Sequence, residues 1–255
     1  KNIFEKEEEQ YYPLYEAKFI QQFNHRFGTF EEVDRENRFI RRASTNTPTK
    51  DNKSDPDFEI LPRYWVSEDD FDEVTANIEW DEEWVFSFRD IARVTSDSRT
   101  AMGTICPYYA FGNTAPILTF SGKTLAKRAL LFTSLYTSFV FDYALRQSMG
   151  GTHVNLYILK QLPMPEPSEL DKYRVYNDDL DCSASSFLEK RALKLVWTSH
   201  SLDHLGSSIS YQDSPTIWED GERRTIRAEI DAVIAHIYDL SRSEFEHILD
   251  SFDIL

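Results

Sequence analysis

The chain has 255 residues, of which 41% are hydrophobic and 14% are aromatic. It is long and apolar enough to form a folded core, so we expect that most of it is not intrinsically disordered. Its formal net charge of −16 would by itself argue against nucleic-acid binding, because attraction to phosphate dominates that affinity. Two cysteines, Cys106 and Cys182, show no Cys-x-x-Cys spacing, which predicts a reduced, cytoplasmic protein. The longest uncharged part of the main predicted helix, 129–141, is shorter than the roughly 20 residues of a spanning helix, so no membrane is expected as a partner.

The N-terminal third alternates strand-like and polar segments. Residues 15–30, YEAKFIQQFNHRFGTF, are rich in aromatic side chains, and part of this run fits a strand. Residues 43–57 have one Ala as their only apolar residue and contain two prolines, which predicts a mobile loop. A strand interrupted near Pro62 follows, and the Ser67-x-x-Asp70 pattern then predicts the start of a short helix.

The central part combines β-prone runs with one long helical pattern. The runs WVFSFRDIARV, RTAMGTICPYYAFG and NTAPILTF are separated by turn signals and predict a small mixed sheet. Apolar residues then recur with spacings of 4, 3, 4, 3 and 4 from Leu125 to Tyr143, and this predicts one largely buried helix over 125–147 that includes Phe132 and Phe139. Gly150 and Gly151 are expected to supply the left-handed or otherwise permissive conformations that end it.

Beyond Pro167 the helical patterns take over. Apolar residues from Ile226 to Leu240 repeat at helical spacing, and Ser241-x-x-Glu244 is a capping box for a last helix. The predicted fold is therefore mixed α/β: a small mixed β-sheet domain with a long buried helix over 1–165, followed by a mostly helical extension over 166–255.

Charge is unevenly distributed along the chain. Residues 86–160 carry a net charge of +5, which leaves −21 for the rest, and four arginines at positions 35, 38, 41 and 42 form a second basic cluster. A local basic face permits contact with nucleic acid despite the overall charge. Ordinary solvated surfaces would account for the same composition.

No catalytic chemistry emerges from the motifs. Residues 121–124, SGKT, end like a phosphate-binding loop, but Ile117 stands where the first glycine is needed, so a helix N-terminus near a lysine is the better account. His200 and His204 would share a helix face, yet they lack the further ligands of a metal site. The chain has neither a Gly-x-Gly loop nor an Asn-Pro-Pro-Tyr motif, so we expect no catalytic, cofactor-binding or metal-binding residues.

Three central strings, FRDIARVTSDSRT, YYAFGNTAPIL and SFVFDYALRQSMGGTHVNLYILKQLP, resemble the C-terminal specificity region of large single-chain adenine-specific DNA methyltransferases. These are bacterial restriction-modification and phage-defence enzymes of type IIG or BREX-like kind. The resemblance extends over nearly the whole chain, including the tail string IWEDGERRTIRAEIDAVIAHIYDLSRSEFEHILDSF. In that family a preceding domain performs methyl transfer with S-adenosylmethionine, and this chain lacks that domain's motifs.

The resemblance implies a target-recognition domain that binds double-stranded DNA and works with an N-terminal methyltransferase domain. His153 and Asn155 alternate with Val154 and Leu156, so on an extended segment they would share one face, with the apolar pair on the other. Asn113, His153 and Asn155 are the base-edge candidates. The phosphate candidates are Arg89, Arg93, Arg99, Lys123, Lys127 and Lys160. Two alternatives stay open: His153 and Asn155 only tie down the turn, or the chain is a protein-interaction module whose acidic tail docks onto the parent enzyme or a partner subunit.

Overall fold

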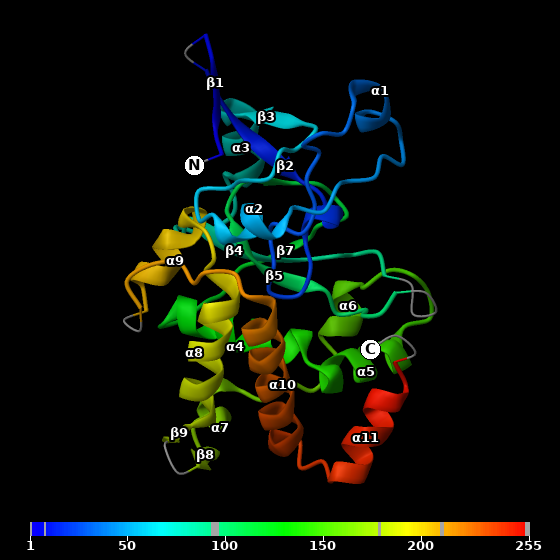
Figure 1. Cartoon of the computed structure of the whole chain (residues 1–255), viewed down its shortest axis with the longest axis vertical. Coiled ribbons are helices and arrows are strands. Elements are labelled where there is room, and N and C mark those ends of the chain that lie inside the picture. Colours follow the sequence, from blue (N-terminus) through cyan, green and yellow to red (C-terminus); the bar gives the residue numbers. More distant parts are fainter. Residues whose placement is uncertain (1, 8, 93–96, 178–179, 210–211, 253–255) are drawn as a thin grey trace.

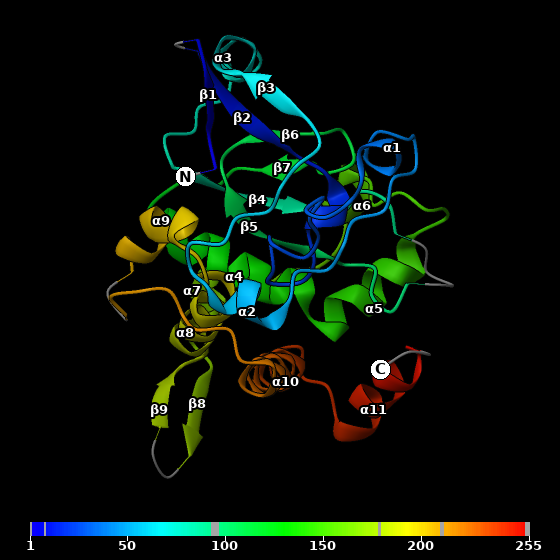
Figure 2. The ribbon, with the colours of Figure 1, turned by 45° about the horizontal axis from the view of Figure 1, so that its top comes forward.

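The computed structural model describes residues 2–7, 9–92, 97–177, 180–209 and 212–252, with the side chain of Asn177 left out. Its fold is mixed α/β, as predicted. Two small sheets occupy one half of the molecule, and the other half is mostly helical (Figure 1). Figure 2 shows that a two-stranded antiparallel sheet, formed by β8 and β9, extends from the helical half. None of the described helices combines the length and the apolar character that crossing a bilayer requires.

Each small sheet is built around one central strand. In the first sheet, β2 lies between antiparallel β1 and β3 and also pairs in parallel with β6. In the second, β4 lies between antiparallel β5 and β7, and every residue of β4 and β5 is buried. The bounds are β1 Phe4–Lys6, β2 Glu9–Tyr15, β3 Trp65–Ser67, β4 Trp84–Phe88, β5 Gly103–Pro107, β6 Ala110–Phe111 and β7 Ile117–Leu118.

The aromatic segment 15–30 forms a second core rather than a strand. Strand β2 ends at Tyr15, and a short 3₁₀ helix, η1 (Ala17–Phe19), follows it. The rings of Phe19 and Phe30 meet edge to face with their centroids 5.9 Å apart, and both side chains are fully buried. Tyr15, Phe19, Ile20 and Phe30 therefore fill a core that is built partly from loops, whereas Phe23 packs in the larger core with strand β4.

The segment 43–57 contains helix α2 (Lys50–Ser54), so the prediction of a loop throughout was wrong. Thr49 and Asn52 form a reciprocal capping box at its start. The buried guanidinium of Arg26 then donates hydrogen bonds to the backbone carbonyls of Lys53, Asp55 and Phe58, at 2.9 to 3.0 Å. The charged side chain of Arg26 thus holds in place the segment 43–57, which has almost no apolar residues of its own.

The long helix predicted over 125–147 is broken at Ser138 into α4 (Leu125–Thr137) and α5 (Phe139–Ser148). Ser138 is extended, with ψ of 154°, and its hydroxyl accepts the backbone N–H of Phe141, which caps α5. The N–H of Phe139 donates to Oδ1 of Asp231 at 2.9 Å. Phe132 and Phe139 are partly rather than fully buried, in contrast to the prediction.

The turn after α5 does not use the glycines as predicted. Neither Gly150 nor Gly151 has a positive φ, and a Cβ atom added at either would meet nothing within 4 Å. The positive φ angles nearest to these two helices lie at the other end, at Gly122 and Thr124, with values of 97° and 55°, just before α4.

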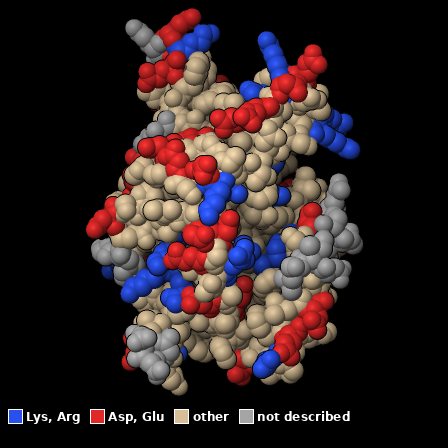
Figure 3. All heavy atoms as spheres, viewed as in Figure 1, with Lys and Arg blue, Asp and Glu red and all other residues tan. Residues whose placement is uncertain are grey.

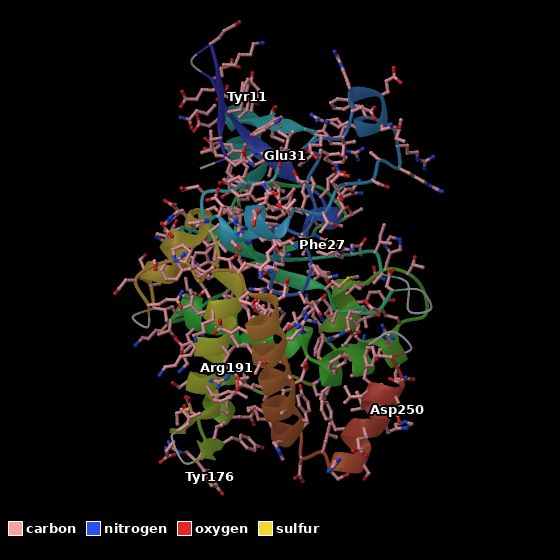
Figure 4. The ribbon with its side chains drawn as sticks, in the orientation of Figure 1. Tyr11, Phe27, Glu31, Tyr176, Arg191 and Asp250 are labelled. Carbon is pink, nitrogen blue, oxygen red and sulfur yellow. The ribbon has the colours of Figure 1, made fainter. Side chains whose placement is uncertain are left out.

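Helices of the C-terminal part pack on α4 and α5. One continuous core joins strand β4, helix α4, helix α8 (Ala184–Val196) and helix α10 (Asp220–Ile237). Arg191, labelled in Figure 4, links α8 to α10 through an ion pair of 2.6 Å with Glu229. The remaining elements are α1 Arg35–Arg38, α3 Glu68–Thr75, α6 Leu156–Leu159, α7 Pro167–Leu170, β8 Arg174–Asn177, β9 Leu180–Ser183, η2 His200–Leu202, α9 Asp203–Ser207 and α11 Arg242–Asp250.

Polar contacts also connect the first 30 residues with the C-terminal helices. Arg26 donates to the carbonyl of Thr198 at 2.7 Å, and Arg223 donates to the carbonyl of Phe23 at 3.0 Å. Both arginines are buried. A division between residues 165 and 166 remains a prediction, and the core and these hydrogen bonds run across it.

Candidate nucleic-acid interface

Three segments that are distant in sequence lie side by side at the end of strand β4. The backbone N–H of Asp90 donates to the carbonyl of Thr114 at 3.0 Å. On the other side, Ala92 N–H donates to Thr152 at 2.9 Å and Val154 N–H donates to Asp90 at 2.7 Å. These bonds place Asn113 and the Thr-His-Val-Asn string on either side of one short extended segment.

His153 and Asn155 point to solvent beside Asp90. Nδ1 of His153 lies 2.7 Å from Oδ2 of Asp90, and the imidazole remains more than half exposed. Val154, by contrast, is buried, as the alternation predicts. Leu156 is 44% exposed, which corrects the prediction that it shares the buried side: Asn155 is the residue before α6, and from there the helical period replaces the strand period.

Large apolar side chains surround this pair at the surface. Ile91, which bridges to His153, is 43% exposed, and Tyr157 in α6 is 64% exposed. Lys160 follows α6 and is also exposed. We use the name His153 surface for the exposed group made by Ile91, Asn113, His153, Asn155, Leu156, Tyr157 and Lys160. It offers amide and imidazole hydrogen-bonding groups beside an aromatic ring that stands free enough to stack.

Two of the predicted phosphate-binding arginines, Arg89 and Arg99, instead form contacts within the protein. Arg99 is buried and forms an ion pair of 2.7 Å with Asp142, so it is not available to DNA. Arg89 donates from Nε to the carbonyl of Ile20 at 2.5 Å, and its guanidinium lies 5.2 Å from the ring centre of Phe27 (labelled in Figure 4). Burial lowers the pKa of the Arg89 side chain, which agrees with a packed rather than a solvated position.

The predicted lysines are divided between two places. Lys123 and Lys127 lie at the N-terminal end of α4, where Lys127 approaches Asp171 at 3.8 Å. The His153 surface adjoins α5, which follows the C-terminal end of α4. Because α4 has 13 residues and is therefore about 20 Å long, these lysines and the His153 surface lie near its opposite ends. Arg93 lies outside the described residues. Among the described residues, the structure therefore groups Asn113, His153, Asn155 and Lys160 but does not bring Arg89, Arg99, Lys123 and Lys127 to the same exposed face.

Charges of both signs are interspersed on the face seen in Figure 3, with no extended basic area. Helix α1 projects from the body (Figure 1), and Arg35, Arg41 and Arg42 in and after it are exposed. Glu31, Glu32 and Glu36 lie among them and are exposed too. Any attraction of phosphate to this face must therefore be local.

Sequence reasoning missed a buried polar cluster between the N-terminal segment and η2. Nε2 of His25 lies 3.2 Å from Oγ of Ser199, and Glu59 forms a hydrogen bond with Ser201. Burial raises the pKa of Glu59 to about 7 and places the pKa of His25 well below its ordinary value. Ser199 and His25 are almost completely buried, and the carboxylate bonds to a different serine, so this is not a nucleophile–base–acid series at a surface.

His200 and His204 each pair with a carboxylate rather than with each other. His200 lies 3.0 Å from Asp203, and His204 lies 3.2 Å from Glu82. Within the described part of the chain, no three His, Cys, Asp or Glu side chains are placed to hold a metal ion.

Comparison with known proteins gives no further assignment. No protein-family model matches the chain, no curated protein is detectably similar to it, and no solved structure matches it.

Proposed function

We propose that this chain is a DNA target-recognition module that belongs to an adenine-specific DNA methyltransferase of restriction-modification or phage-defence type. The observation that supports it best is the convergence of three segments, which exposes Asn113, His153 and Asn155 beside Tyr157. Asparagine can pair bidentately with adenine, and an exposed tyrosine can stack on an unpaired base. The residues with these capacities come together even though 42 positions separate Asn113 from Asn155.

Electrostatics favours weak, local contact with the DNA backbone. The net charge of −16 repels phosphate at long range, whereas Lys160 provides one exposed cation on the His153 surface. We expect binding by the chain alone to be weak, with a slope of about −1 to −3 when log affinity is plotted against log salt concentration, which corresponds to few phosphate contacts. The preceding methyltransferase domain would supply the rest of the affinity, the S-adenosylmethionine site and the chemistry.

The test is methylome sequencing of cells whose full-length enzyme carries His153→Ala or Asn155→Ala. A lost base contact is worth roughly 1 to 3 kcal/mol of discrimination, so the methylated motif should relax at one position. Lys160→Ala should lower methylation at all sites without changing the motif. His236→Ala, at an exposed histidine on α10, is the matched control and should change neither. An unchanged motif with unchanged occupancy in both the His153 and the Asn155 variants would refute the proposal for this surface.

A further inference from the structure

An open groove of about 360 Å³ lies between helix α3 and the segment 108–117, within the size range of pockets that bind ligands. Its floor is formed by apolar side chains of the first sheet and the β6–β7 connection, including Leu14, Val66 and Phe111. Helix α3 forms one wall. Asn113 lies at the other wall, so the groove and the His153 surface meet at this residue, while the other members of the His153 surface do not line the groove.

The apolar stripe of α3 is only half covered by the protein itself. Phe71 packs inward, with its ring centre 4.8 Å from that of Tyr12 and 5.5 Å from that of Tyr108. Val74 follows Phe71 at helical spacing, and Ile78 lies three residues beyond the end of the helix. Val74 is nevertheless 77% exposed and Ile78 is 36% exposed, and both line the groove. Their apolar surface remains available to another molecule.

The helix that carries this stripe is strongly acidic. Five of the eight residues of α3 are Asp or Glu, all of them exposed, and no basic residue lies in its last turn. Acids in the first turn stabilise a helix through its dipole, and Ser67 caps that end. Asp72 and Glu73 lie in the last turn, where the dipole disfavours negative charge, so helix stability does not account for them. No lysine or arginine of the described chain forms an ion pair with a carboxylate of α3.

We propose that this groove binds a short basic amphipathic segment of a partner protein, whose apolar side chains cover Val74 and Ile78 and whose Lys or Arg side chains meet the acids of α3. Charge complementarity selects this occupant. DNA is excluded, because the carboxylates repel phosphate. A second copy that docked its own α3 would bring like charges together. The proposal does not depend on DNA binding.

The experiment measures fluorescence anisotropy of a labelled 12-residue peptide with leucine anchors and flanking arginines, titrated with the full chain. Two matched peptides replace either the arginines by glutamates or the leucines by serines. We expect saturable binding of the first peptide only, weakened at least fivefold between 50 and about 200 mM salt, since an exposed electrostatic contribution is screened. Equal binding of the glutamate peptide would overturn the proposal.

Two substitutions in the chain locate the binding site. Glu73→Lys should weaken binding about tenfold while stabilising α3, because it places a cation in the last turn, so loss of binding cannot be attributed to unfolding. Val74→Ser should weaken it by a similar factor at an already exposed position. Asp250→Lys is the matched control, since Asp250 is also an exposed acid in the last turn of a helix, α11 (Figure 4). If Asp250→Lys weakens binding as much as Glu73→Lys does, the attraction is non-specific and the assignment is overturned. Self-association of the chain, measured by sedimentation and abolished by Val74→Ser, would also overturn it.

Discussion

Nε of Arg99 lies 2.7 Å from Oδ2 of Asp142, and both side chains are buried. The same carboxylate accepts the backbone N–H of Thr100 and lies 3.4 Å from Nε of Arg146. The Arg99 guanidinium is also stacked 3.9 Å from the ring centre of Phe139. This pair therefore holds the segment before β5 against the break between α4 and α5.

Arg99→Ala should destabilise the protein by about 3 to 5 kcal/mol, because it leaves the Asp142 carboxylate buried without its main partner. The measurement is the free energy of unfolding in urea. Lys123→Ala, which removes an exposed cation, should stay within about 0.5 kcal/mol of the parent chain. A loss below 1 kcal/mol for Arg99→Ala would contradict the structural role assigned to it.

Glu59 should make the protein less stable as pH rises from about 4.5 to 7. Burial raises its pKa from 4.5 to about 7, so in this window the folded state keeps a proton that the unfolded state has lost. The contribution is on the order of 3 kcal/mol, fully present below pH 4.5 and absent above pH 7. Glu59→Gln should flatten this part of the profile, measured by urea unfolding at a series of pH values. Asp231, whose pKa burial raises to about 6, would still contribute at lower pH. Identical profiles for the two proteins would show that Glu59 is not the group responsible.

Two glycines should respond in opposite ways to alanine. A Cβ at Gly206 would come within 2.4 Å of the Trp197 ring, so Gly206→Ala should cost about 1 to 3 kcal/mol through overpacking. Gly150→Ala meets no atom and needs no positive φ, so it should be neutral or stabilise by up to about 1 kcal/mol, since the unfolded chain loses entropy. Melting temperatures of the two variants, recorded side by side, decide the matter. Destabilisation by Gly150→Ala would restore the original expectation of a strained turn.

Ser138→Ala should cost about 1 kcal/mol, because it removes the hydroxyl that caps α5. Ser148→Ala is a suitable control, since that exposed hydroxyl only bonds back to the carbonyl of Ala144. Chemical denaturation of both variants provides the comparison. If Ser138→Ala is as stable as the control, the break is held by Asp231 and packing rather than by the cap.

Local sequence signals predicted the elements whose causes are local. Ser67-x-x-Asp70 and Ser241-x-x-Glu244 do begin helices α3 and α11, and the apolar spacing around Ile226 and Ile230 marks the buried face of α10. The break at Ser138 was not predictable in this way, because it is stabilised by Asp231, 93 positions later. Helix α2 carried a local capping signal at Thr49, but its anchor is Arg26, and the polar composition concealed it.

The candidate site was predictable only in part for the same reason. The polar Thr-His-Val-Asn string could be recognised as exposed, and Val154 as buried, from alternation alone. The approach of Asn113 and Asp90 to that string depends on backbone hydrogen bonds between three distant segments. The charge of Arg99 makes it a candidate for phosphate contact, but nothing near it in sequence reveals that Asp142 neutralises it in the interior.

The four carbonyl contacts of Arg26 join parts of the chain that are synthesised far apart in time. Its guanidinium needs Lys53, Asp55 and Phe58, and also Thr198, which is synthesised 172 residues later. At ribosomal rates of about 5 to 20 residues per second, that delay is on the order of ten to thirty seconds. During this delay the Arg26 guanidinium lacks one of its carbonyl acceptors, and helix α8 is not yet present to cover α4. Residues 1–30 therefore cannot complete their buried contacts until Thr198 has left the ribosome, and chaperones that shield apolar surface would act within this interval.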